Sequence, residues 1–201
     1  MKIKQHRRQA AFTLIELMAV ITIIVILGSL VVGSYSYVML RQANAKARVQ
    51  IALLSKALED YKSDMGTYPL TGDKSTATSP TGTGTSTTYL WQPLFKDGYD
   101  YTNLATPPTP PKATKIYCAD LNPVSTKQGW VTTVTSMPAS STVVDPWGNE
   151  YCYRSAMPLT GTIPNAATLN PDFDLWSMGK DGKTNPGTPS DKVNLDDIKN
   201  F

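Results

Sequence analysis

The hydrophobic pattern of the chain changes once in its first third. Residues 12–32 are almost continuously apolar and carry one charge, Glu16. A helix of about 21 residues rises roughly 31 Å, enough to cross a hydrocarbon core of about 30 Å. Beyond it, apolar residues recur at spacings of four and three: Ala47, Ile51, Leu54, Leu58, Tyr61 and Met65. This pattern predicts one helix from about Phe12 to Met65, apolar all round in its first half and amphipathic in its second.

The segments after this helix are shorter and more polar. Gly66, with Pro69 soon after it, predicts the helix end. Residues 71–88 are rich in Thr, Ser and Gly and predict a surface loop, and the Pro-rich residues 105–114 predict an extended spacer. Residues 89–95 are apolar enough to return to the core as a short helix or an irregular segment.

β-type patterns are confined to the last third of the chain. Residues 130–135 are β-prone, but the sequence does not place them in a sheet. Residues 145–148 (DPWG) suit a type I turn, and residues 151–153 and 173–178 then predict two strands. Gly179 opens a tight turn after the second strand. The chain therefore predicts an α+β fold, with a long N-terminal helix followed by a small C-terminal antiparallel sheet.

Charge and composition exclude several classes of function. The chain has 201 residues, with 19 Lys and Arg against 16 Asp and Glu. Four of the basic residues lie in the first eight positions, so the remainder has 15 basic against 16 acidic residues and a balance of −1. A basic nucleic-acid surface on the body is therefore not expected. The only histidine is His6, which excludes a His-dependent triad in the body. Cys118 and Cys152 are too few for a Cys-rich zinc site, although they could form one disulfide in an oxidising compartment.

The basic N-terminus orients the apolar segment. Positive flanks stay in the cytoplasm, so the rest of the chain is expected outside it. An ordinary cleaved signal peptide is the alternative, but the apolar run is longer than usual and no A-x-A site closes it. Glu16 is costly in lipid, by a few kcal/mol. It either reaches back to the membrane edge, as in a free-standing anchor and stalk, or pairs with another subunit. Cleavage after Ala11 would create a partner for it, the α-amino group of Phe12 in a neighbouring chain.

The N-terminus resembles that of type IV pilins and pseudopilins. The resemblance lies in a basic leader, the small residue Ala11, the run Phe-Thr-Leu-Ile-Glu from Phe12 to Glu16, and an apolar helix. It implies cleavage between Ala11 and Phe12 by a prepilin peptidase, N-methylation of Phe12, and a role for Glu16 in subunit assembly. Two positions depart from the family: Ala11 stands where Gly is usual, and Gly33 where many members have Pro.

The C-terminal motifs resemble those of the major pseudopilin of type II secretion. They are DPWGN-x-Tyr-x-Tyr from residue 145, Phe-Asp-Leu-x-Ser-x-Gly-x-Asp-Gly from residue 173, a late Asp-Ile, and Asp-x-Gly-x-Tyr-Pro over 64–69. The resemblance implies the pilin fold and a Ca²⁺-binding loop after the last strands. The ligands carried over are the side chains of Asp181, Asp197 and Asp191 and the backbone oxygens near Leu175 and Met178, with Asp196 as an alternative to Asp197. From the residues alone, solvated acidic loops and a helix N-cap explain these carboxylates better than a metal site does, and the spacing is not that of an EF-hand.

The resemblance also implies an organisation and a function. We expect a cleaved leader (1–11), a membrane or filament-core helix (12–33), an amphipathic helix (34–66), a variable region (67–142), and a sheet with a calcium loop (143–201). The expected function is that of a structural subunit, not an enzyme, in a pseudopilus that helps move folded proteins across the outer membrane. Its expected partners are other copies of itself, minor pseudopilins, the inner-membrane assembly platform and the prepilin peptidase. The subunit would sit in the inner membrane with its head in the periplasm.

Three other functions stay open from the sequence. A type IV pilus subunit would share the N-terminus and could close its C-terminal region with a Cys118–Cys152 disulfide. A membrane-anchored, Ca²⁺-dependent binding module could use exposed tryptophans, and an enzyme would need an acid/base pair of carboxylates. The tryptophan candidates are Trp91, Trp130 and Trp147, and the carboxylate candidates are Asp145 with Glu150 and Asp172 with Asp174.

Overall fold

A computed structural model of the chain describes residues 12–69, 87–96, 115–124, 129–132, 134–135, 138, 140–156 and 168–201. The predicted leader, the spacer at 105–114 and nearly all of the loop at 71–88 lie outside these residues. The chain divides into two compact units, Met1–Gln42 and Ala43–Phe201. We describe each unit by itself.

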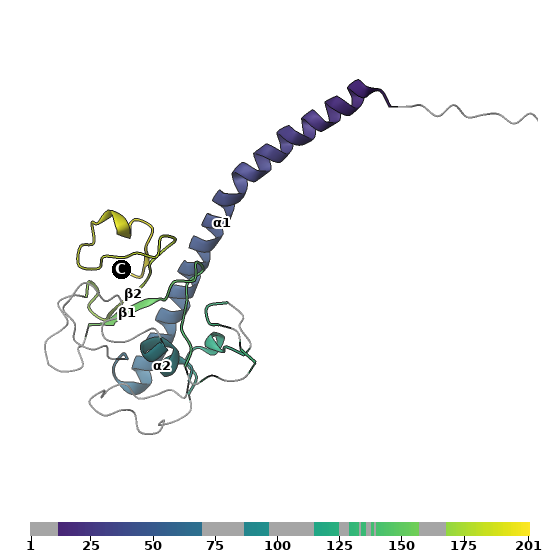
Figure 1. Cartoon of the computed structure of the whole chain (residues 1–201). Coiled ribbons are helices and arrows are strands. Elements are labelled where there is room, and N and C mark those ends of the chain that lie inside the picture. The colour runs from purple at the N-terminus through teal and green to yellow at the C-terminus, as the bar shows by residue number, and fades with distance from the viewer. Residues whose placement is uncertain are drawn as a thin grey trace, which may run out of the picture. The chain divides into compact units, whose positions relative to one another are not determined.

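The long helix predicted from the hydrophobic pattern is confirmed. α1 (Leu14–Met65) runs without interruption from the apolar segment into the amphipathic one (Figure 1). Thr13 caps its first turn: the Glu16 N–H donates to Thr13 Oγ1 at 3.3 Å, and Thr13 N–H donates to Glu16 Oε2 at 2.9 Å. This reciprocal pair is a capping box, which satisfies two backbone donors that the first turn leaves without helical partners.

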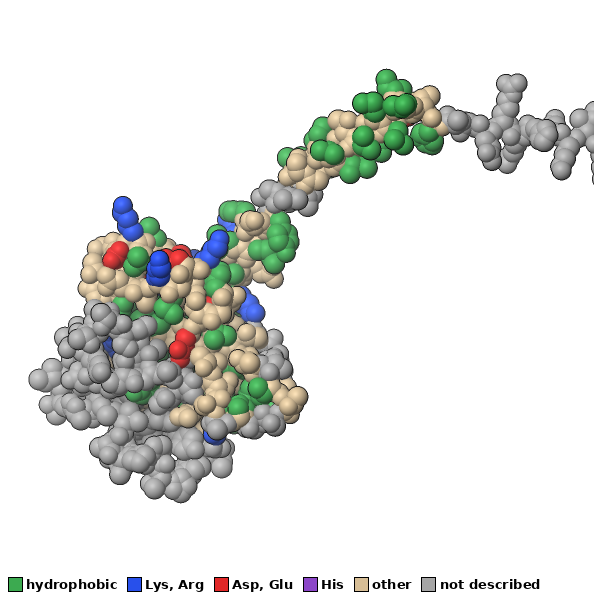
Figure 2. Space-filling model, in the orientation of Figure 1, with side chains coloured by type: hydrophobic (Ala, Val, Ile, Leu, Met, Phe, Trp, Pro, Cys, Tyr) green, Lys and Arg blue, Asp and Glu red, His purple; other side chains and the backbone are tan. Residues whose placement is uncertain are grey.

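The first unit carries exposed apolar side chains over most of its length. Phe12 is 82% exposed and Leu30 is 65% exposed, and the side chains between them include Ile, Val, Leu and Met on every side of the helix. Figure 2 shows apolar side chains spread along the visible face of the N-terminal part of α1. Within the described residues, α1 is the one helix long and apolar enough to span a membrane. Its first half therefore has no polar face to present to water.

In the second unit, the predicted apolar stripe of α1 forms one wall of the core. Ala47, Leu54, Leu58 and Tyr61 are fully buried, and Ile51 is nearly so. The helix ends at Gly66, whose φ of +81° lies in the left-handed region and whose N–H donates to the Lys62 carbonyl at 2.8 Å. A glycine adopts this conformation without steric cost, which explains why the helix stops there.

The C-terminal part of the second unit holds a three-stranded antiparallel sheet in the order β1-β2-β3. Its strands are β1 (Cys152–Ser155), β2 (Phe173–Ser177) and β3 (Ile198–Lys199). Cys152 pairs with Trp176, and Trp176 pairs with Lys199. The two predicted strands are confirmed with small shifts in their ends, whereas β3 was not predicted. The β-prone run at 130–135 contributes one isolated bridge, Val131 with Val143, so within its described residues it adds no strand.

Irregular segments close the other side of the core. Residues 87–96 form a π-helical turn, Thr87–Trp91, and the short α2, Gln92–Leu94, while Ala119–Leu121 form a 3₁₀ turn. Trp91 and Trp130 are fully buried, and their Nε1–H groups donate to the Leu121 carbonyl at 3.1 Å and the Asp120 carbonyl at 2.8 Å. These tryptophans are core residues, which removes two of the three aromatic side chains on which a surface binding module would depend.

The two cysteines are both free and buried, so the disulfide that the sequence left open is not formed in this structure. Burial raises the pKa of the Cys118 thiol to about 11 and that of Cys152 well above its ordinary value. Thiols with raised pKa values are weakly nucleophilic at neutral pH, so each acts as a small apolar side chain of the core.

Candidate functional site

The N-terminal candidates lie at the start of α1. Phe12 is exposed, and Ala11 lies outside the described residues. The Glu16 carboxylate accepts from both the backbone N–H and the hydroxyl of Thr13, the latter at 2.8 Å. The sequence interpretation missed this intrachain partner, although the spacing Thr-x-x-Glu at a helix start is a recognisable signal. Glu16 is thus oriented by its own chain before any neighbour approaches.

The turn after β2 leaves no room for a side chain at its first position unless neighbouring atoms shift. Gly179 has φ of +64°, and a Cβ added there would lie 2.3 Å from the Asp196 carbonyl oxygen and 2.7 Å from its Oδ2. This close approach places the Asp196 carboxylate against the turn, where Oδ2 accepts from the Asp181 N–H at 3.0 Å. Asp181 and Asp196, 15 residues apart in sequence, therefore meet at this turn.

The other two acidic candidates are held by different partners. Asp191 caps the 3₁₀ turn Lys192–Asn194 by accepting from the Val193 N–H, and it accepts from Asn185 Nδ2 at 2.8 Å. These hydrogen bonds, led by that of Asn185, hold the pKa of Asp191 below its ordinary value. The N-cap interpretation of this residue is therefore confirmed.

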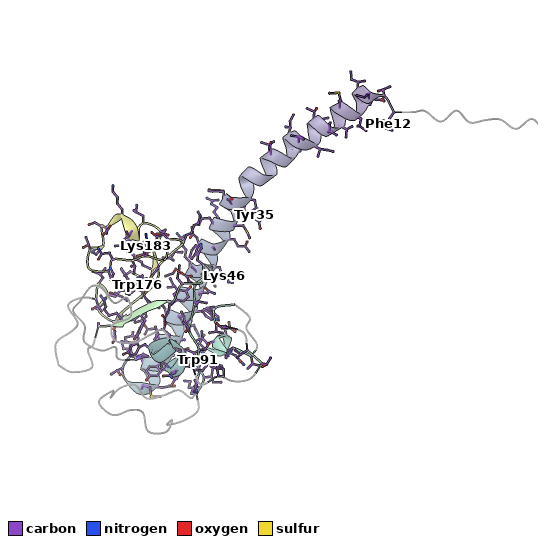
Figure 3. The ribbon with its side chains drawn as sticks, in the orientation of Figure 1. Phe12, Tyr35, Lys46, Trp91, Trp176 and Lys183 are labelled. Atoms are coloured by element: carbon purple, nitrogen blue, oxygen red, sulfur yellow. The ribbon has the colours of Figure 1, made fainter. Side chains whose placement is uncertain are left out.

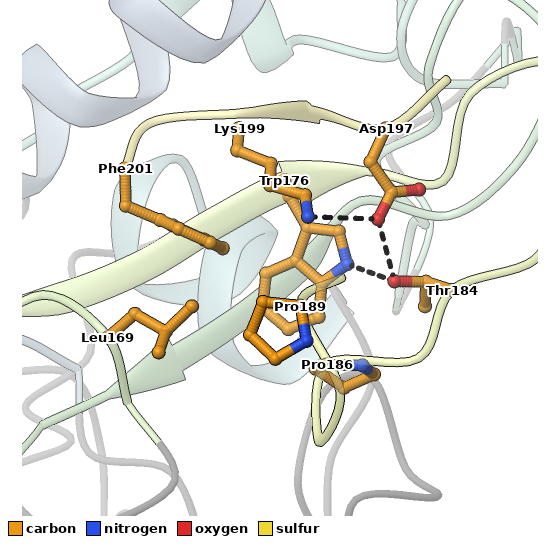
Figure 4. Close-up of a pocket in the computed structure, with 8 residues that line it drawn as sticks. All are labelled: Leu169, Trp176, Thr184, Pro186, Pro189, Asp197, Lys199 and Phe201. Atoms are coloured by element: carbon orange, nitrogen blue, oxygen red, sulfur yellow. Dashed lines mark hydrogen bonds and ion pairs between the residues drawn. The ribbon is translucent and has the colours of Figure 1, made fainter. Parts of the chain in front are cut away.

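Asp197 faces the interior of the loop. Its side chain is only 1% exposed, and its Oδ2 accepts from Thr184 Oγ1 at 3.0 Å and lies 3.6 Å from Lys199 Nζ (Figure 4). Its Oδ1 is buried and has no hydrogen-bond partner. Burial raises the pKa of this carboxyl, against the opposing effects of Thr184 and Lys199. An orphaned buried carboxylate oxygen is costly, so this atom can accept a donor or a cation.

A cavity beside Asp197 is too small to be a ligand cleft. Its volume is about 10 Å³, the room of one water molecule. Trp176 forms one wall, with its Nε1–H donating to Thr184 Oγ1 at 3.1 Å and its ring edge-to-face with Phe201. Figure 4 shows the lining residues, which are Leu169, Trp176, Thr184, Pro186, Pro189, Asp197, Lys199 and Phe201. These contacts fix the loop against the sheet.

The DPWGN motif clamps the turn after β2. Asp145 is 2% exposed, and its Oδ1 accepts from the Trp147 N–H at 3.0 Å and the Asn149 N–H at 2.8 Å. Its Oδ2 accepts from Ser177 Oγ at 2.6 Å, while Asn149 Nδ2 donates to the Gly179 carbonyl at 2.6 Å. The predicted turn is confirmed by the Gly148 N–H, which donates to the Asp145 carbonyl at 3.0 Å. Sequence reasoning identified the turn but not the strand end that it holds.

The carboxylates offered as acid/base pairs also have structural partners. Asp145 is enclosed by the turn that it stabilises, and Asp174 accepts from the N–H groups of Leu169 and Asn170, both at 2.9 Å. Asp172 forms an ion pair with Lys62 at 3.1 Å. These contacts give the three carboxylates a role in stabilising the fold, so a catalytic role is not needed to explain them.

The loop carries the oxygen ligands that a calcium ion prefers, but in this structure they are not arranged to bind one. Every candidate ligand supplies hard oxygen, as Ca²⁺ requires, and the orphaned Asp197 oxygen fits a cation. However, the described residues contain no group of three or more His, Cys, Asp or Glu placed to hold a metal ion. The Leu175 carbonyl accepts from the Asn200 N–H at 3.0 Å, and Met178 follows directly after β2. Ligation by the whole predicted set would require the loop to exchange existing hydrogen bonds for metal contacts.

Comparison with known proteins adds information on both ends of the chain. Residues 6–32 match the family described as the prokaryotic N-terminal methylation motif. A protein of Pseudomonas aeruginosa named type II secretion system core protein G is 32% identical over 182 residues, covering 89% of each chain. Its namesake from Vibrio cholerae is 28% identical over 180 residues, covering 90% of this chain and 86% of the relative. The namesake from Aeromonas hydrophila is 45% identical over 67 residues, which are 33% of this chain and 47% of the relative.

Proposed function

This chain belongs to the family of type II secretion system core protein G, and we propose that its mature form is the structural subunit of a type II secretion pseudopilus. In this role many copies assemble into a helical filament that helps move folded proteins across the outer membrane. The observation that carries the proposal is the two-part helix α1. Its first half exposes apolar side chains on all sides, and its second half is the wall of a folded head. Such a helix can pack in a filament core while its head remains outside.

Assembly would use Glu16 and the new N-terminus together. Cleavage after Ala11 leaves an α-amino group on Phe12, close to the carboxylate of Glu16 in sequence and on the same helix start. A neighbouring chain's ammonium could share the Glu16 oxygens that Thr13 already orients. An ion pair inside an apolar bundle is strongly favoured over either charge left alone, so it would set the register between copies.

The same proposal gives a location and partners. The basic leader lies in the cytoplasm, α1 anchors the subunit in the inner membrane, and the head lies in the periplasm. Processing requires a prepilin peptidase, and assembly requires an inner-membrane platform and minor pseudopilins. Of the carboxylates considered for catalysis, Asp145, Asp172 and Asp174 make hydrogen bonds or an ion pair within the fold. In the proposed role the subunit is structural, and a separate ATPase would supply the energy for its movement.

We further propose that Ca²⁺ binds the loop after β2 and stabilises the head. Asp181 would supply a carboxylate oxygen from the turn and Asp197 its orphaned Oδ1, with Asp196 as the alternative to Asp197. Pairing a buried oxygen that has no hydrogen-bond partner favours the folded state, and a ligand that binds only this state stabilises it by mass action. At a concentration 100 times the dissociation constant the gain is about 2.7 kcal/mol.

In-cell cross-linking with intact mass spectrometry tests the filament proposal. We expect a mature chain that starts at methylated Phe12 and a ladder of cross-linked species that Glu16→Ala weakens at least tenfold. Thr22→Val is the matched control, because it changes a polar side chain on the same half of α1, whose hydroxyl donates to the Met18 carbonyl, and leaves Glu16 and Thr13 intact. It should retain most of the ladder. A processed chain without a ladder, or loss of the whole apolar segment on processing, would contradict the proposal.

Calcium binding is tested by thermal unfolding of the full-length mature chain in detergent, with Ca²⁺ or with a chelator. We expect Ca²⁺ to raise the midpoint, and Asp181→Asn or Asp197→Asn to abolish the rise. Asp60→Asn is the control for net charge, because Asp60 lies on α1 in an ion pair with Lys56, away from the loop. Equal midpoints with and without Ca²⁺ would remove the calcium proposal and leave the filament proposal intact.

A further inference from the structure

Two tyrosines follow the apolar half of α1 closely. Tyr35 is 62% exposed and Tyr37 is 60% exposed, and Figure 3 marks Tyr35 at this level of the helix. Arg41 lies four residues beyond Tyr37, with its guanidinium 5.1 Å from the centroid of the Tyr37 ring. Arg41 is also the first charged residue after Glu16 in the sequence. The apolar segment is therefore followed by two exposed aromatic rings and then by a cationic side chain.

We propose that Tyr35, Tyr37 and Arg41 form an anchor for phospholipid headgroups, which sets the depth of the subunit in the membrane before assembly. Hereafter these three residues are the headgroup anchor. The inference rests on the membrane insertion included in the proposed function. It adds which residues fix the position of the helix along the membrane normal.

The spacing along the helix fits the thickness of a bilayer. The apolar run 12–32 spans about 31 Å, close to the hydrocarbon thickness of about 30 Å. Tyr35 and Tyr37 then lie about 4.5 and 7.5 Å beyond Val32 at 1.5 Å per residue. The headgroup layer occupies roughly 5–8 Å on each side of the hydrocarbon. Both rings therefore fall in the layer where Tyr is enriched, because its ring is apolar and its hydroxyl is polar.

The orientation of the two rings favours a surrounding layer over a protein partner. Residues two apart on an α-helix project about 200° apart, so Tyr35 and Tyr37 emerge on nearly opposite sides. One protein surface lying along the helix would contact one ring and leave the other uncovered. A lipid interface surrounds the helix and contacts both.

Arg41 supplies the complementary charge. Its backbone lies about 13.5 Å beyond Val32, outside the headgroup layer. Helical side chains lean toward the N-terminus, and the stacking of Arg41 on Tyr37 brings its guanidinium back toward that layer. A guanidinium there can donate paired hydrogen bonds to a lipid phosphate.

Depth measurement by spin labelling tests this inference on the full chain in vesicles of phosphatidylcholine and phosphatidylglycerol. Ser29→Cys and Ser36→Cys place labels on the apolar segment and between the two tyrosines. The native cysteines are buried, and the unsubstituted chain gives the background labelling. We expect the Ser29 label in the hydrocarbon and the Ser36 label in the headgroup layer. Tyr35→Leu/Tyr37→Leu removes both hydroxyls and lengthens the apolar run, so the Ser36 label should move inward by about 3 Å or more, two residues of helical rise.

The control variant is Val38→Leu/Met39→Leu, which changes apolar side chains at the same level and should not move the label. Arg41→Gln should shift it only in vesicles that contain phosphatidylglycerol. An unchanged Ser36 depth in the tyrosine variant, or a Ser36 label in bulk water with Ser29 buried, would overturn the headgroup anchor alone. A Ser29 label in water would overturn membrane insertion as well. Spin–spin broadening at Ser36 that the tyrosine variant abolishes would assign the rings to contacts between copies and overturn the anchor.

Discussion

The carboxylate of Asp145 joins the DPWGN turn to the end of β2, and its removal gives the sharpest test of how the C-terminal region is held together. Its three hydrogen bonds come from the Trp147 N–H, the Asn149 N–H and the Ser177 hydroxyl, at 3.0, 2.8 and 2.6 Å. Ser177 is fully buried. Asp145→Ala therefore leaves three donors without their acceptor, one of them out of reach of water.

The magnitude follows from those donors. A donor left without an acceptor costs about 1–3 kcal/mol when buried and less when water can reach it. Removing a buried carboxylate also recovers part of its desolvation cost, which is the main cause of the raised pKa of Asp145. The net loss in the free energy of unfolding is therefore about 2–4 kcal/mol. For a chain of this size that loss lowers the midpoint of thermal unfolding by roughly 5–15 °C.

The assay is thermal and urea unfolding of the mature chain in detergent, with and without Ca²⁺. Asp145→Asn is the matched control, because its remaining oxygen can accept from both backbone N–H groups, so only the Ser177 hydroxyl loses its acceptor. It should cost about 1–2 kcal/mol, less than Asp145→Ala. Asp172→Ala, which removes an exposed ion pair with Lys62, should cost no more. Equal losses in Asp145→Ala and Asp145→Asn would refute the reasoning, because the donors would then not depend on that acceptor.

Three further predictions concern the same head. Gly179→Ala should cost about 1–3 kcal/mol and expose the loop to limited proteolysis, since its Cβ would meet Asp196. Gly148→Ala, with positive φ but open space, should cost only about 1 kcal/mol, and equal effects would contradict the steric argument. Leu54→Ala in the core should cost about 2–5 kcal/mol in urea unfolding, whereas Val49→Ala at 54% exposure should be nearly neutral. Burial raises the pKa of Asp145 above its ordinary 3.8, so the folded state binds more protons than the unfolded state between those two values. Its contribution to stability should therefore fall as pH rises through that window, and Asp145→Asn should flatten the slope. Parallel slopes in urea unfolding from pH 3.5 to 7 would contradict this assignment.

The helix could be predicted almost to the residue because its signals are local. The apolar stripe from Ala47 to Tyr61 follows the helical period, and Gly66 is a conformational stop that needs no distant partner. The capping box at Thr13 and Glu16 is equally local and was readable from its spacing. The strand β3 was not predictable in the same way. It has two residues, Ile198 and Lys199, and it exists only because β2 offers a free edge.

In the candidate calcium loop, too, one feature could be predicted from the sequence and another depends on the fold. The sequence identified the acidic residues as a class, but not which of them lie together. Asp196 approaches Asp181 because Gly179 lets the Asp196 backbone come within a distance that no other residue would allow. Asp197 points instead into the interior, toward Thr184 and Lys199. Neighbouring residues on an extended segment face opposite sides, so a shift of one position exchanges their roles.

By itself, the sequence determined the processing motif, the helix with its two kinds of surface, and the absence of histidine chemistry in the body. Each of these depends on residues adjacent in the chain or on composition alone. Only the tertiary structure decided that Asp145 and Asn149 clamp the turn at Gly179, and that Trp91 and Trp130 are buried. These contacts join segments about 10 to 32 residues apart. They form because buried donors and acceptors must be paired, and the fold determines which partner is within reach.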